Sequence, residues 1–385
     1  MPSGLKHVER HCRHEPAIKK GGRIRPLRIM HTEASPGWGG QEIRVLTECI
    51  AMSVRGHEVA IAAPRQNPLF SRAEQAGLRV FATSFNKKNP CDFFRFRSIL
   101  HSFRPDIVNT HSSGDSWIAG LAVPTCGGKT KVVRTRHLST PISTSFLSTL
   151  VYARLADAIV TTGEAIRSAM IERNGFNPDR ITSIPTGIDM NRFDPDKVKP
   201  SLPRNGFAFG AAGVLRSWKG HRFLIEALPI LQKEIPDAHL YIAGDGPQRE
   251  SLAALIREKG LDRAVTMLGH REDIPEVIAS LDVLVHPSYD HEGVPQSMLQ
   301  ALALRRPVVA TSFGALKEII HDGATGLLVP PKDASAIAAC VLRLYRDGGL
   351  RLRLGAAGRE FVASNFSLDH MLDETERLYA RLMND

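Results

Sequence analysis

The sequence predicts an α/β protein of two successive domains, each built around a parallel sheet. Its 385 residues are enough for two separate cores. Short runs rich in β-branched residues alternate with helical patterns, which is typical of strands buried on both faces of a parallel sheet. The alternation pauses over DPDKVKPSLPRNG (194–206), a stretch with three prolines and several charges, and then resumes.

The first half alternates expected strands and helices. Residues 41–54 carry apolar side chains at helical spacing, and Gly56 suits the C-terminal end of that helix. The expected strands are LRIMHTEA (27–34), HEVAIAAP (57–64), DIVNTHS (106–112), KVVRTRH (131–137), AIVTTG (158–163) and ITSIPTG (181–187).

The second half repeats the alternation and ends in a helix that begins near Ser367. Its expected strands are FAFGAAGV (207–214), HLYIAGDG (239–246), DVLVHPS (282–288), PVVATS (307–312) and GLLVPP (326–331). We therefore expect a first Rossmann-like domain at 27–195, a linker at 196–206 and a second Rossmann-like domain at 207–358.

Composition narrows the class of protein. Hydrophobic residues make up 43% of the chain, which fits a folded globular protein. No apolar run reaches the ~18 residues of a membrane span, and the N-terminus lacks the apolar segment of a secretory signal. The five cysteines are odd in number and widely spaced, so they predict neither a disulfide framework nor a metal cluster. This pattern favours a reduced, cytoplasmic protein.

Residues 1–26 are strongly basic and hold about half of the formal net charge of +10. They predict a mobile arm that either solubilises the chain or is attracted to anionic lipid. Aromatic residues make up only 6% and do not interleave with basic runs, so we expect no nucleic-acid partner.

Several polar residues follow expected strands, and ligands of open parallel sheets bind at the carboxyl ends of strands. Gly39 and Gly40 in SPGWGGQE (35–42) allow backbone N–H groups to approach a ligand at the start of a helix, although a plain tight turn explains them equally well. His111 and His137 each close a strand and are suited to bind a sugar hydroxyl; the alternative is a capping or core histidine.

The stretch VLRSWKGH (214–221) follows the first strand of the second domain. Arg216 and Lys219 lie three residues apart, and two cations at a strand-to-helix turn suit a diphosphate. The alternative is a solvated basic turn.

Glu292 follows a later strand and precedes the turn of Gly293, Val294 and Pro295. Backbone N–H groups at the start of the next helix suit a phosphate, which the carboxylate would repel. We therefore expect Glu292 to accept hydrogen bonds from hydroxyls of a neighbouring sugar, the alternative being a helix-capping acid.

From about Leu27 onward the chain resembles glycosyltransferase family 4, whose members are retaining sugar-nucleotide transferases of the GT-B fold. The resemblance rests on segments that share the family's order and spacing. These are IPTGIDMNRF (184–193), WKG (218–220), YIAGDGP (241–247), EGVPQSMLQALALRRPVVAT (292–311) and HDGATGLLVPPKD (321–333).

The resemblance implies two Rossmann-like domains that face a central cleft, with the nucleotide mainly on the second domain and the acceptor on the first. It implies no metal and no other cofactor for donor binding. Residues 359–385 are then helices that pack back toward the first domain. Lys219 corresponds to the family's diphosphate lysine and Glu292 to its sugar-binding glutamate.

The remaining correspondences complete the expected site. Gly40 matches a phosphate-side glycine, His111 the sugar-facing histidine, and His270, after the strand VTMLG, the grip on the nucleobase. Residues 293–295 supply backbone contacts to the donor, and His137 is expected on the acceptor side.

Three positions depart from the family pattern. Gln300 replaces a second glutamate, so its contact with the ribose would lack charge assistance. Val214 replaces an arginine, whose part Arg216 is expected to take. Arg306 stands where a small residue is usual, and the sequence assigns it no role.

The sequence thus predicts a metal-independent, retaining hexosyltransferase-type enzyme that moves a sugar from a nucleoside-diphosphate sugar to an acceptor hydroxyl. Its expected catalytic residues are His111, Arg216, Lys219 and Glu292. The expected setting is synthesis of lipopolysaccharide, capsule or a lipid-linked saccharide, in the cytoplasm or on the inner face of its membrane. The alternatives are a sugar-nucleotide epimerase of the same fold and a non-catalytic sugar-nucleotide binding protein.

Overall fold

The computed structural model describes residues 25–143, 145–203, 206–290 and 292–384, so most of the expected basic arm lies outside the described residues. The chain forms two compact units. The first unit runs to Pro185 and also includes the residues from Met371 onward, and the second unit is Thr186–His370.

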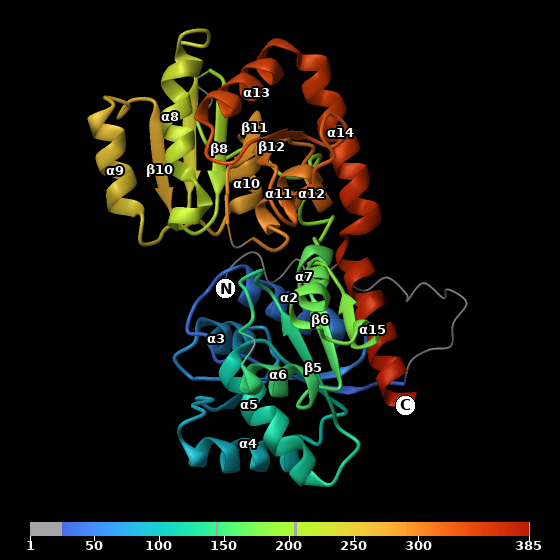
Figure 1. Cartoon of the computed structure of the whole chain (residues 1–385). Coiled ribbons are helices and arrows are strands. Elements are labelled where there is room, and N and C mark those ends of the chain that lie inside the picture. The colour runs from blue at the N-terminus through green and yellow to red at the C-terminus, as the bar shows by residue number, and fades with distance from the viewer. Residues whose placement is uncertain (1–24, 144, 204–205, 291, 385) are drawn as a thin grey trace. The chain divides into compact units, whose positions relative to one another are not determined.

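The first unit is built on a sheet of seven parallel strands in the order β3-β2-β1-β4-β5-β6-β7. Figure 1 labels β5 and β6 of this sheet. One of them, β3, is missing from the strands expected from the sequence; it is a four-residue edge strand with no fully buried side chain, so it lacks a continuous apolar run. The strands are β1 (Arg28–Thr32), β2 (Glu58–Ala63), β3 (Arg79–Ala82), β4 (Ile107–Thr110), β5 (Lys131–Arg136), β6 (Ala158–Thr161) and β7 (Ile181–Ser183).

Helices connect these strands, as parallel pairing requires. On one face of the sheet, α4 and α5 pack their apolar side chains against Met30, Ala60 and Val108 of three neighbouring strands. The helices of the unit are α2 (Gly40–Val54), α3 (Pro68–Gln75), α4 (Pro90–Phe103), α5 (Ser113–Ala122), α6 (Phe146–Ala153), α7 (Glu164–Asn174) and α15 (Leu368–Asn384), with 3-10 turns η1 (Val123–Cys126) and η2 (Pro178–Arg180).

The second unit has six parallel strands in the order β10-β9-β8-β11-β12-β13. Their short apolar runs are buried on both faces, which is why they show no polar alternation. The strands are β8 (Ala208–Ala212), β9 (His239–Ala243), β10 (Val265–Gly269), β11 (Val283–His286), β12 (Val308–Thr311) and β13 (Leu327–Val329).

Two apolar layers cover this sheet. Helices α8, α9 and α13 pack with Phe209, Leu240 and Val283 on one face, and α11, α12 and α14 pack with Leu284 and Val308 on the other. The sheet is therefore doubly wound. The helices are α8 (His221–Gln232), α9 (Arg249–Glu258), α10 (Ile274–Ala279), α11 (Gln296–Ala303), α12 (Leu316–Ile319), α13 (Ala334–Arg346) and α14 (Gly348–Asn365), with the 3-10 turn η3 (Ser217–Lys219).

The two units divide after Pro185 and after His370, whereas the expected domain bounds are 195 and 358. Ile188 and Phe193 are buried in the second unit with Val362 and Phe366, and the Ile188 N–H donates to the Phe366 carbonyl at 2.8 Å. The described part of the expected linker also bonds to the second unit, since the Tyr241 hydroxyl donates to the Pro203 carbonyl at 3.0 Å.

Helix α15 contributes to the first unit from Met371 onward. The Asn109 side-chain amide donates to the Tyr379 hydroxyl at 3.0 Å, and Arg55 forms ion pairs of 2.8 Å with Asp373 and Glu376. Tyr379 is fully buried. The first unit is therefore completed by residues from the far end of the chain.

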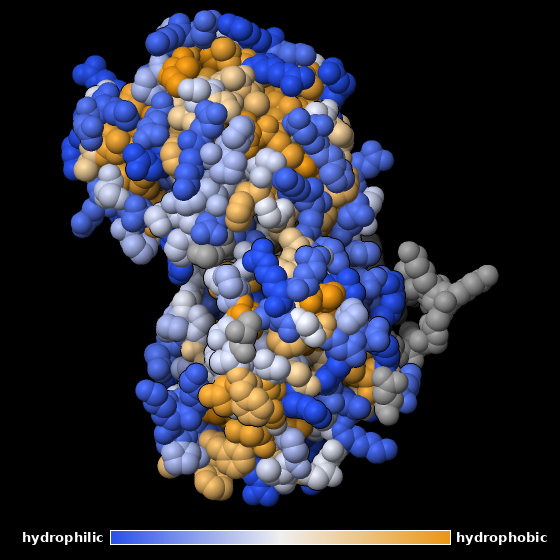
Figure 2. All heavy atoms as spheres, viewed as in Figure 1, coloured by the Kyte–Doolittle hydropathy of each residue, from blue (hydrophilic) through white to orange (hydrophobic). Residues whose placement is uncertain are grey.

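Hydrophilic side chains dominate the visible face of the molecule, with apolar side chains gathered in places (Figure 2). In the first unit the exposed apolar side chains include Phe94 of α4 and two consecutive residues of α6, Phe146 and Leu147. Within the described ranges, no helix is both long and apolar enough to cross a membrane.

Candidate functional site

The carboxyl ends of β8 and β11 bring Lys219 and Glu292 together. The two strands are neighbours in the sheet. Lys219 lies in η3, directly after β8, and Glu292 follows β11. The Lys219 ammonium (Nζ) is 2.6 Å from Oε1 of Glu292, so residues 73 positions apart in the sequence form an ion pair. Both had been predicted as site residues.

Gly220 sets the direction of the chain between η3 and α8. Its φ of 70° is left-handed, and a Cβ at this position would lie 2.2 Å from the Pro287 carbonyl oxygen. Only glycine fits such an approach without strain. The close contact holds the Lys219 loop against the chain that follows β11.

Two histidines near this pair were not predicted as site residues. His286 ends β11, and its Nε2 is 3.5 Å from Glu292 Oε1 and 3.1 Å from the Ser288 hydroxyl. His221 begins α8 and is also buried; among the described residues its Nδ1 has no hydrogen-bond partner. The signal for His286 was present in the sequence, because it closes an apolar strand as His111 does.

Burial and neighbouring charges set the protonation states of Glu292, His221 and His286. Burial disfavours the Glu292 carboxylate, but the charge of Lys219 and the contact with His286 outweigh burial and hold its pKa below the usual value. Burial, and then Lys219, lower the pKa of His221 to about 3, and burial lowers the pKa of His286. At neutral pH the site therefore contains one cation, one carboxylate and neutral imidazoles, a set suited to a phosphate next to hydroxyl groups.

Three of the other predicted donor-side residues directly follow Glu292 in the sequence, and the remaining ones lie on α11 or at the surface. Val294 and Pro295 are buried and Gly293 is half-buried, directly before α11. Gln300 is half-buried on α11. His270 is exposed after β10, and the exposed Arg216 places its guanidinium 5.0 Å above the Trp218 ring.

The structure also locates two of the departures from the family pattern. Val214 is exposed. Arg306 is half-buried and donates from Nη2 to the carbonyl of Ala279, at the end of α10, at 2.6 Å. Its charge therefore interacts favourably with the carbonyl end of a helix, which is a structural role.

In the first unit, His111 and His137 lie at the carboxyl ends of the neighbouring strands β4 and β5, as predicted. His111 Nδ1 is 2.9 Å from His137 Nε2. A third imidazole, not predicted, extends this contact: His31 Nδ1 of β1 is 2.9 Å from His111 Nε2. His31 and His111 are buried, and His137 is half-buried.

A buried carboxyl lies beside the glycine loop. Glu33 follows β1, accepts a hydrogen bond of 2.7 Å from the Ser35 N–H, and also accepts one from the Gln41 side chain. Burial, and then Asp115, raise the pKa of Glu33 to about 8. Gly39 precedes α2 in an extended conformation, and its N–H donates to Glu42 at 2.8 Å. Gly40, an exposed residue, begins the helix.

Asp115 organises the loop that carries His111. Its carboxylate accepts hydrogen bonds of 2.8 Å from the His111 N–H, 2.9 Å from the Ser112 N–H and 2.8 Å from the Thr32 hydroxyl. These bonds tie the carboxyl ends of β1 and β4 to the start of α5. The backbone of His111 is therefore fixed independently of its ring.

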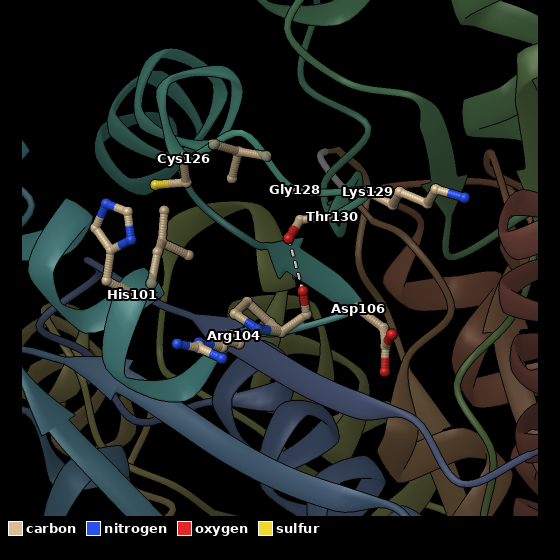
Figure 3. A pocket seen from close by; sticks show the side chains of 10 residues that line it. His101, Arg104, Asp106, Cys126, Gly128, Lys129 and Thr130 are labelled. Carbon is tan, nitrogen blue, oxygen red and sulfur yellow. Dashed lines mark hydrogen bonds between the residues drawn. The ribbon is translucent and has the colours of Figure 1, made fainter.

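A cavity of about 410 Å³ opens in the first unit away from these residues (Figure 3). It lies between the loop after α4 and the loop before β5, and Thr130 donates to the Pro105 carbonyl across it at 2.7 Å. None of the predicted site residues lines it. Among the side chains that the structure describes, no group of three or more His, Cys, Asp and Glu is arranged to hold a metal ion.

Two family models match the chain, one in each half. Glycosyltransferase Family 4 matches residues 38–192, and Glycosyl transferases group 1 matches residues 206–347. Together they span most of the sequence.

Two known relatives match over most of their length. The putative glycosyltransferase EpsD of Bacillus subtilis is 28% identical over 348 residues, which are 86% of this chain and 90% of the relative. The GDP-mannose-dependent alpha-(1-6)-phosphatidylinositol monomannoside mannosyltransferase of Mycolicibacterium smegmatis is 27% identical over 345 residues, which are 81% of this chain and 87% of the relative.

A solved structure has the same fold. The Anabaena protein Alr3699/HepE in complex with UDP-glucose matches with a TM-score of 0.80 and 20% identity, over 92% of this chain and all of that one.

Proposed function

Because the chain belongs to glycosyltransferase family 4 and has its GT-B fold, we propose that it moves a sugar from a nucleoside-diphosphate sugar to a glycan or lipid-linked hydroxyl, with retention of configuration. The observation that carries the proposal is the contact of Lys219, which is half-buried, with the buried Glu292 and His286 at the carboxyl ends of β8 and β11. It offers a cation for a diphosphate beside an acceptor for sugar hydroxyls.

Binding of the donor would change which partners Lys219 and Glu292 contact. The diphosphate binds the Lys219 ammonium in place of Glu292, and the released carboxylate accepts hydrogen bonds from the donor sugar. Arg216 supplies a second cation to the diphosphate by turning away from Trp218. Gly293, Val294, Pro295 and Gln300 border the sugar and ribose, and His270 contacts the base.

The chemistry asks little of the protein beyond positioning and charge. In a front-face displacement, the sugar–phosphate bond breaks and the leaving diphosphate takes the proton of the attacking hydroxyl. Lys219 and Arg216 stabilise the negative charge that develops on the leaving oxygen. His111 and His137 contact hydroxyl groups, and the positive end of α2 at Gly39 and Gly40 attracts the phosphates of the donor.

We further propose that these cations make a metal or other cofactor unnecessary for donor binding. Turnover should therefore persist in the presence of a chelator.

The acceptor and the site of action are inferred from relatives. Two relatives support an acceptor in cell-surface glycan synthesis: the phosphatidylinositol monomannoside mannosyltransferase, and a lipopolysaccharide core biosynthesis glycosyltransferase of Rhizobium meliloti that is 29% identical over 231 residues. The net charge of +10 and the exposed Phe146 and Leu147 support work at an anionic membrane surface on its cytoplasmic side.

Nucleotide release with and without acceptor tests the function. We expect release from one donor that depends on a saccharide or glycolipid acceptor, with the anomeric configuration of the donor retained in the product. Conversion of the donor sugar without acceptor would instead show an epimerase, and binding without turnover under all conditions would show a binding protein.

A thermal-shift screen finds the donor for that assay. One relative is a GDP-mannose-dependent enzyme and one similar structure contains UDP-glucose, so UDP-, GDP- and ADP-sugars should be compared. A donor present at about 100 times its Kd stabilises the folded state by about 2.7 kcal/mol and raises the melting temperature accordingly.

A further inference from the structure

Three imidazoles form a continuous hydrogen-bonded chain across three neighbouring strands of the first unit. His31 of β1, His111 after β4 and His137 after β5 are linked by contacts of 2.9 Å, from Nδ1 to Nε2 each time. The rings of His31 and His111 are parallel within 7°, with centroids 5.2 Å apart. Each contact therefore joins Nδ1 of one ring to Nε2 of the next.

The buried end of this chain faces a carboxylate. Glu48 Oε1 of α2 is 3.9 Å from His31 Nε2, and Glu48 Oε2 is 3.7 Å from Arg44 Nε. Among the described residues His31 Nε2 has no hydrogen-bond partner, and all three side chains are buried. The distance of 3.9 Å exceeds a hydrogen bond, so Glu48 acts on the imidazole through its charge.

The imidazoles are neutral at neutral pH. Burial lowers the pKa of His31, and burial with neighbouring positive groups lowers the pKa of His111 and His137 well below the usual value. Other titratable or charged groups interact with the three imidazoles or with Glu48. They are Arg44 and Cys49 of α2, Arg136 of β5 and Tyr379 of α15.

A chain of neutral imidazoles has two proton arrangements. Each ring carries one N–H, so either every Nε2 or every Nδ1 is protonated, and the choice at one end propagates to the other. A carboxylate near His31 Nε2 favours a proton on that nitrogen. His31 Nδ1 then accepts from His111 Nε2–H, and His111 Nδ1 accepts from His137 Nε2–H. In this arrangement Nδ1 of His137 carries a lone pair.

We propose that Glu48 and His31 are positioning residues that hold His111 and His137 as Nε2–H tautomers, so that the chain ends in a hydrogen-bond acceptor for a substrate hydroxyl. The contact with a substrate rests on the proposed function, whereas the assignment of the tautomers is independent of it. A hydroxyl group of the acceptor saccharide is the chemical class that this lone pair selects, because a hydroxyl donates a hydrogen bond to it.

Nitrogen NMR of protein labelled with ¹⁵N-histidine tests the tautomers without any assay of activity. We expect ring resonances of His31, His111 and His137 in the Nε2–H form, assigned by single substitutions. In Glu48→Gln the charge is lost at almost unchanged volume, and we expect the ring shifts of His111 and His137 to move together toward the other tautomer. An Nδ1–H form of His111 in the wild-type protein, or no change in Glu48→Gln, would overturn the proposal.

Kinetics then separate positioning from packing. In His31→Asn the new Oδ1 can still accept from His111 Nε2–H, whereas His31→Leu offers no polar atom. We expect His31→Leu to lower kcat by about 10- to 100-fold, as for outer partners of metal-bound histidines, with little change in the donor KM. His31→Asn should recover most of that loss. The control Thr47→Ala, on α2 beside Glu48, should leave turnover unchanged.

Equal losses in both variants would show that His31 acts by packing alone. If no donor supports turnover, the proposed function fails while the NMR result still decides the tautomers. The Glu48→Gln measurement also remains decisive if His31→Leu does not fold.

Discussion

Lys219 and Glu292 are unequally buried, with side-chain exposures of 21% and 7%. Removal of the lysine therefore leaves a buried carboxylate without its cation, whereas removal of the charge on Glu292 leaves a lysine that can reach water. We expect Lys219→Met to lower the free energy of unfolding by about 3 kcal/mol, and Glu292→Gln by clearly less. Chemical denaturation of both variants measures the difference.

The pair of Arg222 and Glu226 on α8 gives a control that is closer to solvent, since it has the same charges at 3.0 Å with side-chain exposures of 61% and 26%. Arg222→Met should cost at most about 1 kcal/mol. Both site variants should also lower kcat by about 100-fold or more, because they remove charge from the reacting centre. Equal stability losses in Lys219→Met and Arg222→Met, or wild-type turnover in both site variants, would contradict the assignment.

Glu33 makes the stability of the first unit depend on pH. Its pKa is raised in the folded protein from 4.5 to about 8, so the folded state holds this proton more tightly than the unfolded chain. The resulting stabilisation is complete below pH 4.5 and is lost as the pH rises toward 8. Glu33→Gln should remove this part of the slope, as measured by urea unfolding across that range. The exposed Glu74→Gln should leave the slope unchanged, and a persistent slope in Glu33→Gln would show another group to be responsible.

At the level of single residues, the sequence identified polar groups that end strands but not the contacts among them. His111, His137, Lys219 and Glu292 could be found because each follows a strand that the sequence predicts. The contact of His31 with His111 joins β1 to the end of β4, and the contact of Lys219 with Glu292 joins the segments after β8 and β11. The sequence contains no record of which side chains face each other. Arg306 could not be interpreted for the same reason, because its partner is a backbone carbonyl 27 residues away.

Among the elements, the turn from η3 to α8 depends on Gly220. An alanine there would adopt a left-handed φ of 70° and meet the Pro287 carbonyl at 2.2 Å. Gly260 is a matched control, because its φ is 66° and its Cβ position is open. We expect Gly260→Ala to cost about 1 kcal/mol and Gly220→Ala distinctly more, with a loss of turnover because Lys219 is displaced. Similar stability and activity in the two variants would show that the close contact is unimportant.

The sequence predicted buried strands more readily than edge strands. A strand covered on both faces is buried along its whole length, so β11 (VLVH) and β12 (VVAT) appear as short and mostly apolar runs. The edge strand β3 has one exposed and three half-buried residues, and its sequence RVFA resembles a loop. The helix α2 was predictable because its apolar side chains recur on one face.

For the whole molecule, the apolar spacing of the last helix predicted an amphipathic element but not the unit to which it belongs. From Met371 onward the helix buries Leu372, Leu378 and Tyr379 in the first unit, whose other described residues precede Thr186. This packing couples the last helix energetically to the first unit, and no local pattern in the sequence predicts that coupling.

Deletion of residues 371–385 should therefore destabilise the first unit selectively. The deletion removes several buried apolar side chains, each worth about 1.5–3 kcal/mol, together with the Arg55 ion pairs and the Tyr379 hydrogen bond. This loss is comparable to the whole stability of a typical domain. We expect hydrogen exchange measured by mass spectrometry to show lost protection in β1, β4 and α2, while β8, β11 and α8 stay protected. Deletion of residues 383–385 alone removes no buried side chain of the described helix and should leave both units unchanged. Equal loss of protection in both units would show instead that the helix stabilises the molecule as one cooperative body.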